Sequence, residues 1–291
     1  MTTHPAPMVI GYDGSPGSVS ALDWAVATAG RAMAPLRIVE AFELVITTRP
    51  SPGHVVPLEA VRTARRQRLD ELAAKLRLEH PDLNVETSLI GGAAAKTLVE
   101  AAQDARLVIL GSRGLGGWSG LLIGSVAVQV TTHATCPVVV VPHDYQPQTQ
   151  VEPTVVVGVD GSKYSARAID FAFDQAESLH ARVVAVHAWT SPYLTYRDGE
   201  SMLEFDEDTV REEAQLLVAE SVAGAAADHP DVPWASDLPT GSAGHALVRH
   251  SESADLVVVG TRGHGGFTGL LLGSVGQNVL HHTHCPIAVV H

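Results

Sequence analysis

Short apolar runs recur along the first half of the chain, rich in β-branched residues and without regular polar alternation. Four of them lie at residues 8–11, 36–42, 107–111 and 137–141. Strands that are buried on both faces of a parallel sheet have this pattern. The segments between the runs predict helices over residues 16–33, 58–79, 94–104 and 125–134. This alternation predicts an α/β fold with an open, doubly wound parallel sheet.

The chain contains an internal repeat. Residues 8–42 match residues 155–189, and residues 107–141 match residues 256–290 more closely. The matching blocks lie 147 and 149 residues apart, so the two copies are nearly equal in length. The segment between them is rich in Pro and Gln and lacks apolar periodicity, as linkers do. We therefore predict two tandem domains and a linker between them, at residues 1–143, 155–291 and 144–154.

The composition and charge of the chain argue against some classes of binding partner. The 291 residues carry a formal net charge of −13, which argues against nucleic acid as a principal partner because phosphate backbones need a basic surface. No apolar run approaches the length of a membrane span, and the N-terminus lacks the pattern of a signal peptide. We therefore expect a cytoplasmic protein.

Cys136 and Cys285 occupy equivalent positions in the two copies, which favours buried structural thiols over a disulfide.

Two loops in each copy follow strands and are rich in glycine. The first holds Asp13 in the first copy and Asp160 in the second, each within G-x-D-G-S. The second loop leads from Gly111 to a helix that opens at Gly124, and free N–H groups at such a helix start favour a phosphate. Asp has the wrong charge to bind phosphate. It can instead accept from a ribose hydroxyl or an adenine amine, or help hold a divalent metal.

A single glycine-rich loop is often only a tight turn with a helix cap. Here the same arrangement occurs twice, each time beyond the carboxyl ends of predicted parallel strands, where open sheets bind ligands. The chain has no G-x-x-x-x-G-K-[ST] P-loop, and no G-x-G-x-x-G follows the first strand. The loops therefore indicate an anionic ligand site of another kind.

These motifs resemble those of the universal stress protein family in its tandem, ATP-binding form. The family motif G-x2-G-x9-G-[ST] matches both copies, and the resemblance covers residues 8–141 and 155–290. It implies Rossmann-like domains that each bind ATP, with Mg²⁺ accompanying the nucleotide and no metal site formed by the protein alone. The implied nucleotide-binding residues of the first copy are Gly11, Asp13, Ala41, Gly111, Ser112, Arg113, Gly114, Gly117, Gly124, Ser125 and Val126. Those of the second are Gly158, Asp160, Ala188, Gly260, Thr261, Arg262, Gly263, Gly266, Gly273, Ser274 and Val275.

The resemblance further implies that the glycine motif holds the phosphates, that the Asp lies near the adenosine, and that the backbones of Ala41 and Ala188 contact the adenine. It also implies pairing through the final strand of each domain, and we expect a homodimer as well as an unidentified protein partner. The protein is then an ATP-dependent regulator or sensor in stress response. The loops offer no nucleophile and base common to both copies, which argues against an enzyme. A slow ATPase remains an alternative, because Mg²⁺ and backbone positioning alone give some phosphoryl-transfer catalysis, and so does an interaction scaffold with architectural nucleotide sites.

Two further clusters have plainer interpretations. His281, His282, His284 and Cys285 lie together, but the first copy has threonine at two of the three histidine positions, so we expect no metal site there.

Four arginines, Arg62, Arg65, Arg66 and Arg68, lie on the long helix of the first copy, whose counterpart is acidic. We expect them to form a solvated helix face, with an interdomain contact as the alternative.

Overall fold

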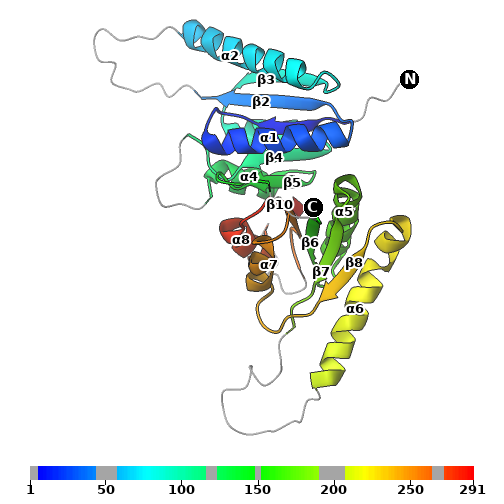
Figure 1. The fold of residues 1–291 in the computed structure, drawn as a ribbon. Helices are drawn as coiled ribbons and strands as arrows, with labels where there is room; N and C mark the ends of the chain where they lie inside the picture. The colour runs from blue at the N-terminus through cyan, green and yellow to red at the C-terminus, as the bar shows by residue number, and fades with distance from the viewer. Residues whose placement is uncertain (1–5, 44–57, 116–122, 148–151, 190–206, 264–271) are drawn as a thin grey trace, which may run out of the picture. The chain divides into compact units, whose positions relative to one another are not determined.

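The structure is a computed structural model that describes residues 6–43, 58–115, 123–147, 152–189, 207–263 and 272–291. The chain divides into two compact units, Met1–Val138 and Val139–His291. Figure 1 shows strands lying side by side within each unit, with helices along them. Among the described residues, no helix combines the length and the apolar character that crossing a bilayer requires.

The first unit alternates strands and helices as the apolar pattern predicts. Its elements are β1 (Met8–Gly11), α1 (Pro16–Arg31), β2 (Leu36–Phe42), α2 (Leu58–Glu79), β3 (Val85–Gly91), α3 (Ala94–Ala101), β4 (Leu107–Gly111) and α4 (Ser125–His133). The strands pair in parallel in the order β3-β2-β1-β4. Strand β5 (Val138–Val141) begins at the division between the units.

The second unit repeats this topology. Its elements are β6 (Thr154–Gly158), α5 (Lys163–Leu179), β7 (Arg182–Val186), α6 (Glu207–Asp228), β8 (Trp234–Asp237), α7 (Ala243–Ser251), β9 (Leu256–Gly260), α8 (Ser274–His282) and β10 (Ile287–Val290). The strands pair in parallel in the order β10-β9-β6-β7-β8. The prediction of an α/β fold with doubly wound parallel sheets is confirmed in both units.

The core lies along the central strands. Ile10 of β1 is in register with Ile38 of β2 and Ile109 of β4, and all three side chains are fully buried. Burying one such side chain contributes about 1.5–3 kcal/mol to the free energy of unfolding. Apolar residues are therefore required at consecutive positions of these strands, because helices cover both faces of the sheet.

Two helix ends differ from the predicted ones by more than one residue. Helix α1 ends at Arg31 rather than at residue 33, and Met33 has a left-handed backbone with φ of 46° and an exposed side chain. Helix α3 ends at Ala101 rather than at residue 104. Helix α2 has the predicted bounds.

The side chains of β2 alternate between two helix layers, as strand geometry requires. Arg37 points toward Asp104, which follows α3, and its Nη1 lies 3.1 Å from Oδ2. Glu40 faces the opposite layer, where it contacts arginines of α2. In the second unit the layers are likewise α5 with α6 and α7 with α8, since the members of each pair contact one another.

The prediction of a solvated face on α2 is wrong for two of its four arginines. Arg65 and Arg68 form ion pairs with Glu40, whose side chain is 0% exposed. The contact lies within the first unit, so the interdomain alternative does not describe it either. Glu40 is the only acidic residue in the run 36–42, and a charge buried in a strand requires a counter-charge.

Candidate functional site

The loop after β1 makes a sharp turn into α1. Gly14 has φ of 81°, a conformation that favours glycine, and its counterpart Gly161 has φ of 75°. Ser15 then caps α1, with its side chain accepting a hydrogen bond from the Ser18 backbone N–H at 3.2 Å. The G-x-D-G-S sequence thus has a local reason: glycine turns the chain, and serine starts the helix.

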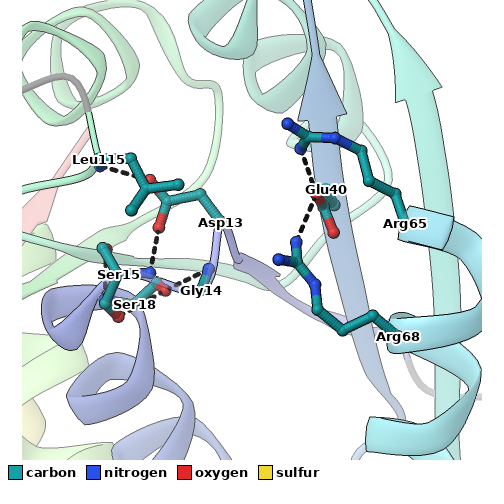
Figure 2. Close-up of polar contacts among 8 residues, drawn as sticks. All are labelled: Asp13, Gly14, Ser15, Ser18, Glu40, Arg65, Arg68 and Leu115. Atoms are coloured by element: carbon teal, nitrogen blue, oxygen red, sulfur yellow. Dashed lines mark hydrogen bonds and ion pairs between the residues drawn. The ribbon is translucent and has the colours of Figure 1, made fainter. Parts of the chain in front are cut away.

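Asp13 connects this loop to the loop after β4. Its Oδ1 accepts from the Ser15 backbone N–H at 2.9 Å, and its Oδ2 accepts from the Leu115 backbone N–H at 2.8 Å (Figure 2). A Cβ atom at Gly114 would lie 2.6 Å from Oδ2, so only glycine leaves room for the carboxylate. The predicted Asp and glycine motifs, 98 or more residues apart in sequence, therefore meet at one place.

Asp13 is held as a carboxylate. Burial acts to raise its pKa, but hydrogen bonds from Ser15, from the Leu115 backbone and from Ser18 outweigh burial, so the pKa lies below its ordinary value. At neutral pH the first site therefore has a fixed negative charge beside its loops.

The second unit repeats this contact. Oδ1 of Asp160 accepts from the Ser162 backbone N–H at 3.0 Å, and a Cβ atom at Gly263 would collide with Oδ2 of Asp160. Ser162 caps α5 by accepting from the backbone N–H of Ser165. The two loops thus have the same internal geometry in both units.

Glycine at the end of β4 has a packing role. A Cβ atom at Gly111 would collide with the backbone of Gly17 in α1, and one at Gly17 would lie 2.5 Å from the Arg113 carbonyl oxygen. At Gly260 a Cβ atom would lie 2.8 Å from the Tyr164 backbone. Close contact between helix and strand therefore suffices to explain these two motif glycines.

The starts of α4 and α8 differ from those of α1 and α5. Gly124 and Gly273 occupy the N-cap positions, and no described side chain caps either helix. The Gly124 backbone N–H donates to the Ser112 carbonyl oxygen at 2.7 Å, and that of Gly273 donates to the Thr261 carbonyl oxygen at 2.7 Å. The first N–H groups of each helix, including those of Ser125 and Val126 and of their counterparts Ser274 and Val275, then remain available to an anion.

The remaining predicted residues lie at the same end of the sheets or outside the described residues. Gly11 and Gly158 end β1 and β6, Ala41 lies near the end of β2, and Ala188 follows β7. Arg113 and Arg262 follow β4 and β9, and Arg262 lies over the ring of Tyr164, 5.8 Å from its centroid. Gly117 and Gly266 lie outside the described residues, as do the loops at residues 44–57 and 190–206.

Glu40 is the residue that the sequence patterns did not single out, although it lies next to Ala41. Its signal was one acid with apolar residues on both sides, at positions 38–39 and 41–42. At the equivalent position of the second unit, His187 bonds through Nδ1 to the Val159 carbonyl oxygen at 2.8 Å. The two units therefore differ immediately beside their predicted adenine contacts.

The histidine cluster and the cysteines are arranged differently from a metal centre. Among the described residues, no group of three or more His, Cys, Asp or Glu side chains could hold a metal ion. His281, His282 and His284 are exposed, whereas Cys285 is buried. Burial raises the pKa of Cys285 to about 12 and that of Cys136 to about 11, so both are thiols at neutral pH.

Comparisons with known proteins agree with the repeat. The model of the universal stress protein family matches twice, at residues 6–142 and 153–291. A universal stress protein of Mycobacterium tuberculosis strain H37Rv is 35% identical over 288 residues, which cover 97% of this chain and 96% of that protein. One from Mycolicibacterium smegmatis is 31% identical, with 97% and 96% covered.

A solved structure shows the same fold. The crystal structure of a universal stress protein from Archaeoglobus fulgidus superposes with a TM-score of 0.71 and covers 98% of each chain, at 20% identity. The two matches to the family model and the full-length mycobacterial relatives together show that the chain belongs to the universal stress protein family, in tandem form.

Proposed function

We propose that each domain binds one ATP molecule with Mg²⁺, and that the protein is a nucleotide-dependent regulator of stress response in the cytoplasm. One observation carries the proposal: a helix start without a side-chain cap lies beside an Asp-bearing loop, and this arrangement occurs in both domains. Helices α1 and α5 are capped by their own serines, whereas α4 and α8 start without a side-chain cap at the glycine motif, where their N–H groups suit an anion.

In this proposal the phosphates bind at the starts of α4 and α8. Backbone N–H groups of Ser125 and Val126 donate to them, and the hydroxyl of Ser125 adds another donor. The space at Gly124 is open, since a Cβ atom there would make only ordinary contacts, 3.5 Å from the Ser112 carbonyl oxygen and farther from the backbone of Arg113 and Gly114. Ser274 and Val275 have these roles in the second domain.

The adenosine lies on the other side, toward the ends of β1 and β2. Each oxygen of Asp13 already accepts one backbone hydrogen bond and can accept a second, from a ribose hydroxyl or an adenine amine. The backbone of Ala41 borders the adenine. Asp160 and Ala188 are the equivalent groups of the second domain.

Mg²⁺ accompanies the nucleotide and supplies charge neutralisation of its phosphates. The described residues contain no group of three or more carboxylate, imidazole or thiol ligands that would bind a metal ion by themselves. The phosphates therefore contribute most of the metal ligands.

Calorimetric titration of nucleotide-stripped protein with Mg-ATP tests the proposal. We expect two sites per chain, of which Asp13→Ala weakens one and Asp160→Ala the other. Asp13→Asn is the milder variant, since an amide oxygen still accepts one of the loop hydrogen bonds. A folded protein that binds no Mg-ATP would contradict the proposal and favour the scaffold alternative.

A steady-state hydrolysis assay separates the regulator from an ATPase. A regulator should hold ATP with turnover far below about 1 s⁻¹, the lower end of typical enzyme rates. The homodimer stays a prediction from the resemblance, and light scattering coupled to size-exclusion chromatography measures it.

A further inference from the structure

Glu40 lies at the centre of a charge cluster that the proposed site does not use. The Nη1 atom of Arg65 lies 2.5 Å from its Oε1, and Nη2 of Arg68 lies 2.7 Å from the same oxygen (Figure 2). The other oxygen, Oε2, is buried and has no hydrogen-bond partner among the described residues. One carboxylate oxygen thus holds two guanidinium groups that extend from α2.

The two arginines differ in what else they contact. A Cβ atom at Gly14 would lie 3.4 Å from Nη1 of Arg68, and the three atoms nearest to that point all belong to Arg68. Gly14 directly follows Asp13 and precedes Ser15, the residue whose N–H binds the Asp13 carboxylate. Arg68 therefore links buried Glu40 to the loop that carries Asp13, whereas Arg65 only contributes charge at Glu40.

The second domain lacks all three members of this cluster. Leu69, Ala73 and Leu76 are the buried residues of α2, and Val218, Val222 and Ala225 occupy the same spacing in α6. This alignment places Ala214 at the position of Arg65 and Leu217 at that of Arg68, and His187 replaces Glu40. Neither an ion pair nor a guanidinium group can support the loop of Asp160 from these positions.

We propose that Arg68, held by Glu40, is a positioning residue of the first site: it fixes the loop that carries Asp13, and it makes the affinity of the first site depend on an ion pair that the second site lacks. The proposal rests on nucleotide binding at the first site. Arg68 acts through Gly14 and Asp13 and does not itself touch the nucleotide.

The charges of Glu40 and Arg68 explain why the Arg68 guanidinium stays beside Glu40 and Gly14. Glu40 is fully buried, so its charge fixes a guanidinium group more strongly than a solvated carboxylate would. The side chain of Arg68 is 47% exposed, and without Glu40 it would have water as its alternative partner. Arg65 neutralises the same carboxylate, which makes Arg65→Ala the matched control for Arg68→Leu.

The binding test uses the full chain with Asp160→Ala, which leaves the first site to be titrated with Mg-ATP. We expect Arg68→Leu, the residue found in α6, to weaken this site about tenfold, as for the loss of about one hydrogen bond. Arg68→Lys should recover part of the affinity, and Arg65→Ala should stay within about twofold of the parent. In an Asp13→Ala chain, Arg68→Leu should leave the second site unchanged.

Amide hydrogen exchange of the ligand-free chain tests the same positioning without nucleotide. We expect Arg68→Leu to speed exchange of the Ser15 N–H severalfold, while Arg65→Ala does not. A parent that binds no Mg-ATP would contradict nucleotide binding, and this exchange difference would then still support the positioning role. Unchanged Ser15 exchange and unchanged affinity in Arg68→Leu, or equal losses in Arg65→Ala, would overturn it.

Discussion

The two domains share the loops that form the candidate site and differ in what supports those loops. Asp13 and Asp160 each accept from the backbone N–H of the serine two residues later, and Gly124 and Gly273 occupy the N-cap positions of their helices. Behind β2 the first domain has a buried carboxylate with two arginines, whereas the second has one histidine bonded to a backbone carbonyl. The difference shows that the same turn and helix cap are compatible with either a buried ion pair or a histidine hydrogen bond as the support.

Replacing the central residue of each support should produce the largest contrast. Glu40→Ala removes two charge-assisted hydrogen bonds and leaves a cavity, while the freed arginines turn to water, so we expect a loss of about 3 kcal/mol in the free energy of unfolding. His187→Ala removes one hydrogen bond to a carbonyl, which costs about 1 kcal/mol. Urea unfolding followed in each domain by amide exchange measures both values. Equal losses would mean that the ion pairs contribute nothing beyond packing.

Motif glycines should be sensitive in both domains where the backbone approaches them. We expect Gly111→Ala to cost about 2 kcal/mol and Gly260→Ala somewhat less, because each added methyl group meets the backbone of a helix. Gly124→Ala is the control, since its methyl group would lie 3.5 Å from the nearest atom, the Ser112 carbonyl oxygen. Thermal unfolding compares the three, and a Gly124→Ala loss as large as that of Gly111→Ala would contradict this packing role.

Low pH should destabilise the first domain, in part because Asp13 becomes protonated. Because its pKa is lower in the folded state, the carboxylate stabilises the domain above about pH 4 and loses this effect as the pH falls through the folded pKa. We expect a contribution below about 1 kcal/mol, since Asp13 is only half-buried. Urea midpoints at pH 7 and pH 3 should differ less in Asp13→Asn than in the parent. An identical pH dependence in both would remove Asp13 from the acid response.

Chemical labelling of the two cysteines should give the smallest effect. With a pKa of about 11, Cys136 is thiolate in only about one molecule in a thousand at pH 8, and Cys285, with a pKa of about 12, in fewer. We expect iodoacetamide to leave both thiols of the folded protein unmodified over an hour, with Cys136 reacting first as the chain unfolds. Mass spectrometry of timed samples measures this order, and rapid labelling of Cys285 would contradict its burial.

Repetition and apolar pattern predicted the fold because two-face burial requires uninterrupted apolar strands, and β1 and β4 meet that requirement. The same pattern placed Asp13 and Gly111 at strand ends, where the structure joins their loops. It did not reveal Glu40, since one acid among apolar neighbours does not show which counter-charge it will meet. Arg65 and Arg68 lie 25 and 28 residues from Glu40 in the sequence, and only the packing of α2 on the sheet brings them to β2.

The hydrogen bond from Leu115 to Asp13 also has a thermodynamic consequence for ligand capture. It closes a contact between residues 102 positions apart and involves protein groups alone. The conformational entropy of joining these two segments is therefore lost during folding rather than during binding. A nucleotide that enters such a preorganised site keeps more of its interaction energy as affinity, and its arrival needs no slow rearrangement of these segments.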